Sequence, residues 1–403
     1  MRNLFYVLVI CLVFSCQTET PKQLQTATYH AVLKVNDSID MPFVFEVTSA
    51  NTLVIKNAEE RIEVDEVSYK NDSVFIKTPV FEGYIAAQLQ DDGSLSGSFI
   101  KENLDRVVPF YAEVGTERFT ETQKADYDVT GNWETVFSPD VEADRYIAKG
   151  IFKQNGNQVT GTFRTTTGDY RFLEGVVSGN QLKLSTFDGA HAFLFTATVN
   201  DSTMQGQFYS GNHWQEPFTA KRNGNYELPD SDSLTFLKAG YDKVSFSFPD
   251  AEGNMVSLND ERFKNKVVLV QIMGTWCPNC LDESKYFAEY YKQNQDKDLE
   301  IIALAFEYVK TEEQGFSNIK RLTERIGITY PVLLAQTGTS SKTAAQEKLP
   351  MLNQVLSYPT TIFIDKTGHV RKIHTGFNGP ATGKKFTTFK TEFEGFVKQL
   401  LEE

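Results

Sequence analysis

In its C-terminal part the chain reads Gly274-Thr275-Trp276-Cys277-Pro278-Asn279-Cys280. This stretch follows a continuous apolar run, Lys266 to Ile272, and precedes a helical pattern from about Cys280 to Gln293. We therefore expect Cys277 where a helix begins, next to free backbone N–H groups and the positive end of the helix dipole, both of which favour a thiolate. Pro278 suits the first helical turn, because its missing N–H costs nothing there.

Cys280 lies one helical turn after Cys277, so it can attack a mixed disulfide formed on Cys277 and release a reduced substrate. A zinc site fits less well, because zinc needs four ligands and the histidines form no set with metal-ligand spacing: His30, His191, His213, His369 and His374. A purely structural disulfide also fits less well, because a bridge across so short a loop constrains the unfolded chain little. The pair predicts a redox-active disulfide, with no metal or other cofactor.

Strands alternate with helices on both sides of this pair. Further strands are expected at Leu299 to Phe306, Tyr330 to Leu334, Thr360 to Asp365 and Val370 to Ile373. Further helices are expected at Glu312 to Ile326 and about Lys384 to Leu401, and a hairpin at Val244 to Phe248 with Met255 to Leu258. This alternation predicts an α/β domain over residues 241–403.

Residues 27–222 show β patterning throughout, with turn signals such as Asn155-Gly156 and no long helical period. A short pattern, x-x-Gly-x-Phe, recurs at Leu95–Phe99, Val159–Phe163 and Met204–Phe208. We interpret the region as all-β, with two related units at about 27–115 and 130–222 that form one sandwich or barrel, or two small ones. Convergent hairpin composition is the alternative. Residues 223–240 have the composition of a linker.

The N-terminus has the pattern of an export signal, with a short positive start and an apolar stretch from Leu4 to Ser15. The stretch ends just before Cys16 and resembles a bacterial lipoprotein signal, so residues 1–16 would be the signal, Cys16 the lipidated residue and 17–26 a tether. An ordinary signal peptide or an uncleaved anchor is the alternative. With Cys11 inside the signal, Cys277 and Cys280 are the one pair left for redox chemistry.

The composition limits the kinds of partner that the chain can bind. The formal net charge is -13, so the chain lacks the positive charge that binding a nucleic-acid backbone requires. An exported location predicts contact with the thiols and disulfides of other exported proteins and with a membrane electron donor, and the lipid would attach the protein to a membrane of the cell envelope.

A second motif accompanies the cysteine pair. About eighty residues later the chain reads Tyr358-Pro359-Thr360-Thr361-Ile362-Phe363-Ile364-Asp365. Together the two motifs resemble the thioredoxin superfamily, and more closely the membrane-tethered TlpA/ResA-type disulfide reductases, over about Val244 to Glu403. The resemblance implies that Pro359 is a cis-proline packed against the pair and that the backbone of Tyr358 can bind an extended substrate segment. It also places Trp276 in the docking surface.

The same resemblance singles out Glu283, which matches a glutamate that ResA-type proteins carry three residues after the second cysteine. One turn beyond Cys280, this carboxyl group could exchange a proton with the thiol pair. A helix-end charge that complements the dipole is the alternative. Ordinary thioredoxins place a buried aspartate where this chain has Gln271, which makes Glu283 the better candidate for proton transfer.

These features predict a thiol-disulfide oxidoreductase that reduces exported proteins. A peroxiredoxin is the enzymatic rival, but such enzymes carry Thr or Ser three residues before the reactive cysteine, where this chain has Gly274. A non-catalytic binding lipoprotein is the second rival. In the β region the surface candidates are Trp214, His191 and the Phe187-Asp188-Gly189 turn, although core packing or turn formation is the favoured interpretation for each.

Overall fold

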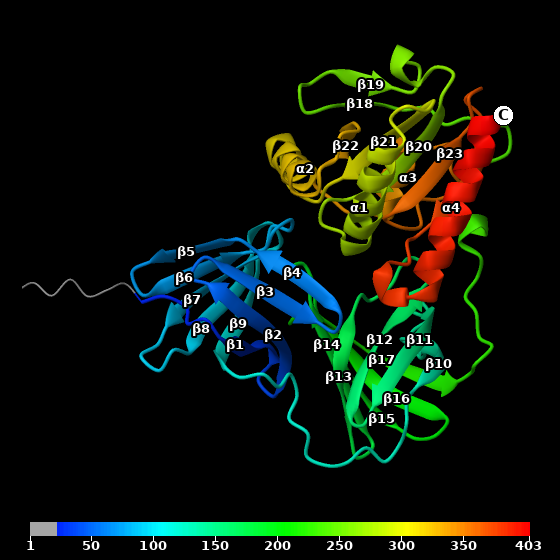
Figure 1. The fold of residues 1–403 in the computed structure, drawn as a ribbon. Helices are drawn as coiled ribbons and strands as arrows, with labels where there is room; N and C mark the ends of the chain where they lie inside the picture. Colours follow the sequence, from blue (N-terminus) through cyan, green and yellow to red (C-terminus); the bar gives the residue numbers. More distant parts are fainter. Residues whose placement is uncertain (1–21) are drawn as a thin grey trace, which may run out of the picture.

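The computed structural model describes residues 22–403, so Cys11 and Cys16 lie outside the described residues. The chain forms three parts, an open β-sheet, a closed β-barrel and a C-terminal α/β domain. In Figure 1 the two β parts lie side by side below the α/β domain, and α4 (Lys384–Glu402) runs down toward the barrel. Within residues 22–403 no helix has the length and apolar character needed to cross a bilayer.

The open sheet is antiparallel and has nine strands in the order β4-β3-β2-β1-β9-β8-β7-β6-β5. Buried and exposed residues alternate along its strands, as in β1, because successive side chains point to opposite faces. Its core also contains Phe187 from the barrel, whose ring centroid lies 4.4 Å from that of Phe43. The strands are β1 (Thr28–Asn36), β2 (Ile39–Ser49), β3 (Thr52–Asn57), β4 (Glu60–Val64), β5 (Glu66–Lys70), β6 (Ser73–Lys77), β7 (Tyr84–Leu89), β8 (Leu95–Lys101) and β9 (Arg106–Val114).

The barrel closes because its first strand, β10, pairs with its last strand, β17, as well as with β11. Its interior is filled by aromatic side chains, among them the fully buried Trp133 and Phe137. The strands are β10 (Gly131–Phe137), β11 (Tyr146–Asn155), β12 (Gln158–Thr165), β13 (Leu173–Ser178), β14 (Gln181–Phe187), β15 (Ala192–Val199), β16 (Thr203–Ser210) and β17 (Trp214–Arg222).

The recurring Gly-x-Phe element has a physical basis in close strand approach. A Cβ added at Gly97, Gly161 or Gly206 would lie 2.0, 2.1 or 2.3 Å from a carbonyl oxygen of the neighbouring strand. Only glycine fits there. Each following Phe is buried in its sheet or barrel core, so the element marks the same local geometry in β8, β12 and β16.

The C-terminal domain has a five-stranded sheet in the order β22-β21-β20-β23-β24, with β20, β21 and β22 parallel and the last two strands antiparallel. The all-β N-terminal region and the C-terminal thioredoxin-like fold are therefore confirmed. The elements are β18 (Ser247–Pro249), β19 (Met255–Ser257), β20 (Val267–Met273), α1 (Pro278–Gln293), β21 (Leu299–Phe306), α2 (Glu312–Ile326), β22 (Val332–Gln336), α3 (Lys342–Lys348), β23 (Thr360–Ile364), β24 (Val370–Thr375) and α4.

The sequence did not predict α3, and it placed the start of the first hairpin strand too early. Helix α3 has seven residues and buries only Ala345, so it leaves no periodic apolar signal. Val244 and Phe246 are buried, but they precede β18 and pair with no strand. The alternating apolar residues therefore indicated which side chains are buried here, but not a strand that pairs with a neighbour.

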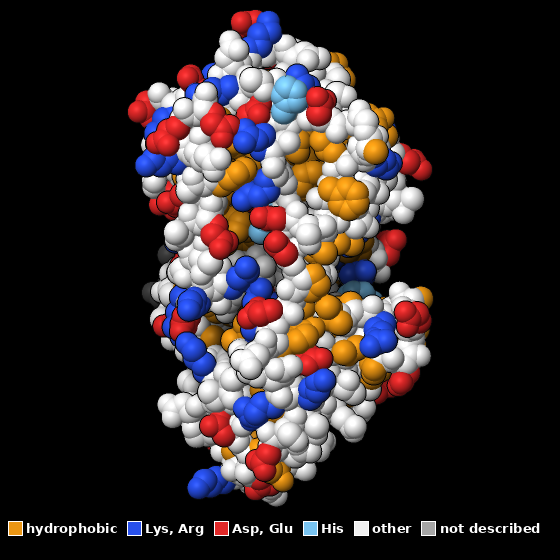
Figure 2. Space-filling view, turned by 90° about the vertical axis from the view of Figure 1, so that its right-hand side faces the viewer, with side chains coloured by type: hydrophobic (Ala, Val, Ile, Leu, Met, Phe, Trp, Pro, Cys, Tyr) orange, Lys and Arg blue, Asp and Glu red, His pale blue; other side chains and the backbone are white. Residues whose placement is uncertain are grey.

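The segment 223–240 is packed along the thioredoxin-like domain. The backbone N–H of Lys238 donates to Met351 (2.8 Å), and the carboxylate of Asp232 lies 2.6 Å from Nδ1 of His374. The open sheet also contacts this domain, because Arg325 pairs with Asp65 at 2.8 Å and with Glu66. On the face in Figure 2 acidic and basic side chains are interspersed, and hydrophobic side chains gather at mid-height.

Candidate active site at Cys277 and Cys280

Cys277 occupies the N-cap of α1, directly after β20 and its connecting loop. The backbone N–H of Cys280 donates to Sγ of Cys277 (3.2 Å), and Sγ of Cys277 in turn donates to the carbonyl oxygen of Tyr358 (3.4 Å). The sulfur thus replaces the side-chain oxygen that usually caps a helix. A thiolate at this position receives a backbone hydrogen bond and faces the positive end of the helix dipole.

Cys280 differs sharply from Cys277 in its surroundings. Its side chain is fully buried, whereas Cys277 keeps 7% of its surface exposed. Burial, together with the adjacent Cys277, raises the pKa of the Cys280 thiol well above its usual value. Both cysteines are free thiols, so this is the dithiol form of the pair. The capped sulfur of Cys277, the less deeply buried of the two, can attack, and burial favours the protonated form of Cys280.

The second sequence motif lies directly against the pair. The Tyr358–Pro359 peptide bond is cis, the geometry that the resemblance implied. The ring of Tyr358 packs edge-on against Trp276 at 5.6 Å and against Phe306 at 5.7 Å. The indole N–H of Trp276 donates to the carbonyl of Phe306 (2.9 Å), so this ring is held in place and only partly exposed.

Glu283 is fully buried on α1 and accepts two hydrogen bonds. Its carboxylate oxygens accept from Nε2 of Gln271 and from the hydroxyl of Thr361, each at 2.8 Å. Burial raises the pKa of Glu283 to about 7, although both hydrogen bonds act in the opposite direction. Its charge acts on the Cys280 thiol and raises the pKa of that group further. Glu283 is therefore not an exposed charge at the end of a helix.

Two charged groups near the pair were not predicted from the sequence. Glu307 is fully buried and accepts from the backbone N–H (2.8 Å) and hydroxyl (2.7 Å) of Thr275, which fixes the loop before Cys277. Burial raises the pKa of Glu307 to about 7. Lys342, on α3, interacts electrostatically with Cys277. The sequence could have pointed to Glu307, because it directly follows a buried strand. It gave no indication of Lys342, which lies in a helix without apolar periodicity.

Comparison with known proteins agrees with this geometry. Residues 240–373 match the AhpC/TSA family model. Over 142 residues the chain is 31% identical to the thiol-disulfide oxidoreductase ResA of Geobacillus thermodenitrificans, a match that covers 35% of this chain and 72% of that relative. The chain belongs to the ResA family of thiol-disulfide oxidoreductases.

Other similarities cover a similar share of the chain. The thioredoxin-like protein YneN of Bacillus subtilis is 27% identical over 140 residues, covering 35% of this chain and 73% of that relative. A solved thiol-disulfide oxidoreductase from Bacteroides fragilis is 25% identical and covers 37% of this chain and 99% of its own, with a TM-score of 0.27. The ResA-type match thus covers about a third of the chain.

The barrel of this ResA-type enzyme contacts its redox pair through residues 166–172, which connect β12 to β13 and are here named the barrel loop. Nδ2 of Asn279, the residue between the cysteines, donates to the carbonyl of Asp169 (3.2 Å). The hydroxyl of Ser357, just before the cis-proline motif, donates to the carbonyl of Thr167 (2.8 Å). A Cβ at Gly168 would lie 2.0 Å from Nδ2 of Asn279, so this close approach requires glycine.

Arg171 in the barrel loop joins all three parts of the chain. Its guanidinium donates to Oδ2 of Asp282 on α1 (2.5 Å), pairs with Glu60 of the open sheet, and lies 3.6 Å from Asp188 of the barrel. It also donates to the carbonyl of Pro278 (3.2 Å). The Arg171 side chain is 5% exposed, so the network lies in a medium where charges interact strongly.

Asp169 adds a second tie between the barrel loop and the thioredoxin-like domain. Its carboxylate accepts from the backbone N–H of Gly379 (2.6 Å). Burial, reinforced by the nearby charge of Asp282, raises the pKa of Asp169 to about 6. The Phe187-Asp188-Gly189 turn is buried at this junction, in line with the favoured interpretation of core packing or turn formation, whereas Trp214 is 45% exposed and His191 is half-buried.

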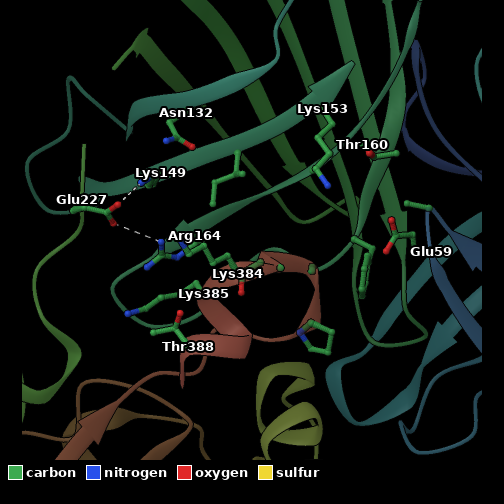
Figure 3. A pocket seen from close by; sticks show the side chains of 18 residues that line it. Glu59, Asn132, Lys149, Lys153, Thr160, Arg164, Glu227, Lys384, Lys385 and Thr388 are labelled. Atoms are coloured by element: carbon green, nitrogen blue, oxygen red, sulfur yellow. Dashed lines mark hydrogen bonds and ion pairs between the residues drawn. The ribbon is translucent and has the colours of Figure 1, made fainter. Parts of the chain in front are cut away.

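A cleft of about 690 Å³ lies between the barrel and the start of α4, away from the cysteines. In Figure 3 Lys384 and Lys385 of α4 lie across from strands of the barrel, and dashed lines join Glu227 to Lys149 and Arg164. The nitrogen–oxygen distances in these two ion pairs are 2.6 and 3.7 Å. Because neither cysteine lines this cleft, it is not the redox site.

Proposed function

We propose that this oxidoreductase reduces disulfides of exported proteins through Cys277 and Cys280. The thiolate of Cys277 attacks one sulfur of the substrate disulfide, a new S–S bond forms, and the displaced substrate sulfur leaves and takes up a proton. Cys280 then loses its proton and attacks Sγ of Cys277, which releases the second substrate thiol. Two electrons pass to the substrate, and the protein keeps a Cys277–Cys280 disulfide that a dithiol donor at the membrane must reduce.

The observation that supports this assignment best is the hydrogen bond from the Cys280 N–H to Sγ of Cys277 at the start of α1. It gives Sγ of Cys277, the less deeply buried of the two sulfurs, a backbone hydrogen-bond donor, while burial raises the pKa of Cys280. Trp276, Tyr358 and Pro359 are assigned to substrate docking beside the sulfur, because Tyr358 already contacts both Cys277 and Trp276.

The test is turnover with a dithiol donor and two competing oxidants. We expect a disulfide-bonded protein to be reduced catalytically and hydrogen peroxide to react at the uncatalysed rate. Gly274 occupies the position where a peroxidase carries Thr or Ser, and the neighbouring Thr275 hydroxyl is engaged by Glu307. Catalytic peroxide consumption without disulfide reduction would contradict the proposal.

Glu283 is proposed to be the proton acceptor for Cys280. With a pKa near 7, its carboxylate becomes available as the pH rises through about 7 and can then deprotonate the resolving thiol. In Glu283→Gln we expect resolution of the mixed disulfide to slow by about 10²-fold at pH 7.5 and its rise with pH to move upward, toward the titration of Cys280 itself. Stopped-flow measurements from pH 5 to 10 check this, and an unchanged profile would limit Glu283 to a structural role.

We propose a cell-envelope location, with the lipid-modified Cys16 as the membrane anchor. The support is the apolar Leu4 to Ser15 stretch directly before Cys16. In cells we expect Cys16→Ser to prevent labelling by a fatty-acid probe and to leave the protein unprocessed or released from membranes. A Cys16→Ser protein that remains normally processed and membrane-bound would identify another anchor.

A further inference from the structure

The barrel loop closes one side of the redox pair. It contacts Ser357 beside the cis-proline motif and Asn279 between the cysteines, and the backbone of Gly376 lies so close to Thr167 that a Cβ there would be 2.8 Å from the Thr167 carbonyl carbon. Trp276, which precedes Cys277, lines a cleft to which the barrel loop also contributes Tyr170.

This cleft, named here the junction cleft, has a volume of about 530 Å³ and receives side chains from all three parts of the chain. Trp276 and Tyr308 line it from the thioredoxin-like domain, with ring centroids 5.9 Å apart. The barrel contributes Phe193 and Trp214, the latter with its ring substantially exposed. Flat aromatic surfaces therefore lead up to the residue that precedes Cys277.

The cleft also holds two cations, Lys101 and Arg106, one of which has no hydrogen-bonded or ion-paired partner in the part of the chain that the structure describes. Among residues 22–403 the guanidinium of Arg106 forms no hydrogen bond or ion pair, and the ammonium of the buried Lys101 donates only to the carbonyl of Ala190 (3.1 Å). Burial, and then the charge of Arg106, lowers the pKa of Lys101, although the charges of Glu82 and Asp188 act in the opposite direction. Burial and the same two cations lower the pKa of His213, which also lines the cleft, to about 4.

Two carboxylates near these cations accept hydrogen bonds from hydroxyl groups and keep their negative charge, and neither pairs directly with Arg106. Glu216 accepts from Ser138 (2.5 Å) and Tyr146 (2.8 Å), and Glu82 accepts from the hydroxyl of Tyr308 (2.9 Å). Two adjacent cations in a partly dry cleft repel each other, and an anionic group bound between them would relieve that repulsion. The lining thus carries two cations and one carboxylate, and Arg106, which has no hydrogen-bonded or ion-paired partner among residues 22–403, is the group that favours an acidic ligand.

We propose that the junction cleft binds an acidic, partly aromatic segment of the polypeptide whose disulfide Cys277 attacks. The acidic residue would pair with Arg106 and Lys101, and the apolar residues would lie on Trp276 and its aromatic neighbours. The inference rests on the proposed disulfide-reducing function and adds the substrate class. The barrel and open sheet are then parts of the substrate site.

The test uses two matched peptides that each contain one disulfide, flanked by Asp and Phe in the first and by Asn and Phe in the second. For the intact enzyme we expect kcat/KM to favour the acidic peptide by about 10-fold or more, the size expected for a partly desolvated charge pair. Arg106→Gln is expected to reduce this preference to within about 2-fold. Arg61→Gln, which removes an exposed arginine from the same sheet, is the matched control and should keep the full preference.

A binding measurement separates this inference from the chemistry. In the double variant Cys277→Ser/Cys280→Ser, cysteine-free versions of both peptides are titrated while the fluorescence of Trp214 and Trp276 is followed. We expect tighter binding of the acidic peptide, weakened by salt and by Arg106→Gln. Equal reduction and equal binding of the two peptides, or a preference that survives Arg106→Gln, would overturn the inference and leave the reductase function standing. If neither peptide is reduced, the proposed function fails. The binding titration alone then tests whether the junction cleft binds an acidic segment.

Discussion

Replacing Cys277 by serine is expected to lower the rate of protein-disulfide reduction by more than about 10³-fold. The hydroxyl stays protonated at neutral pH, so it cannot use the N–H of Cys280 or the helix dipole to become an anion. The fold should be unaffected, because the change is one atom at a helix N-cap where serine is a favourable residue. Turnover with a dithiol donor and circular dichroism of the same sample measure both effects.

Replacing Cys280 by serine is expected to give a different result, an accumulated mixed disulfide between Cys277 and the substrate. The first attack still occurs, but no second thiol can release the product. Non-reducing electrophoresis and mass spectrometry of the trapped adduct identify the linked cysteine. Adducts through Cys280 in the Cys277→Ser protein would contradict the assignment of the two roles.

Arg171→Met is expected to destabilise the folded chain by about 3–5 kcal/mol at pH 8. The side chain is buried, and its removal leaves the carboxylates of Asp282, Asp188 and Glu60 at the junction without their shared cation. Urea unfolding monitored by circular dichroism gives the change. Arg145→Met is the matched control, because Arg145 is exposed and its contact with Glu142 measures 4.0 Å; we expect less than about 0.5 kcal/mol there.

The loss in Arg171→Met should shrink as the pH falls. The charge of Arg171 lowers the pKa of Asp188 and of Asp169, so both pKa values rise when the cation is removed. The folded variant then binds more protons than the folded original chain, and its loss of stability shrinks on acidification. The deficit is therefore expected to be smaller at pH 5 than at pH 8. The barrel loop should also loosen, so a bulky maleimide should alkylate Cys277 faster. An unchanged alkylation rate together with unchanged stability would show that Arg171 does not hold the loop.

Local sequence determined the redox pair and the domain that carries it. The start of α1 depends only on residues that are neighbours in the chain: an apolar strand, then a cysteine before Pro278, then a helical period. Cys277 therefore lies at the N-cap of α1 as predicted. The long elements followed for the same reason, and β21 and α2 begin and end as the sequence predicted. The open sheet and the closed barrel could be predicted only as all-β, because closure depends on whether β10 meets β17, strands more than seventy residues apart.

Tertiary structure alone decided what surrounds the pair. The stretch that contains Thr167, Gly168 and Asp169 looks like an ordinary turn, and its contact with Asn279 joins residues 110 positions apart. Arg171, Glu60 and Asp282 carry no shared motif, because a buried ion pair requires only that opposite charges meet in space. Glu283 was singled out by the resemblance to ResA-type proteins, but its burial against Gln271 and Thr361 depends on how β20 and β23 pair. Periodicity and spacing record local geometry, whereas the charges that meet at the junction are set by the packing of three parts that the chain brings together only when it folds.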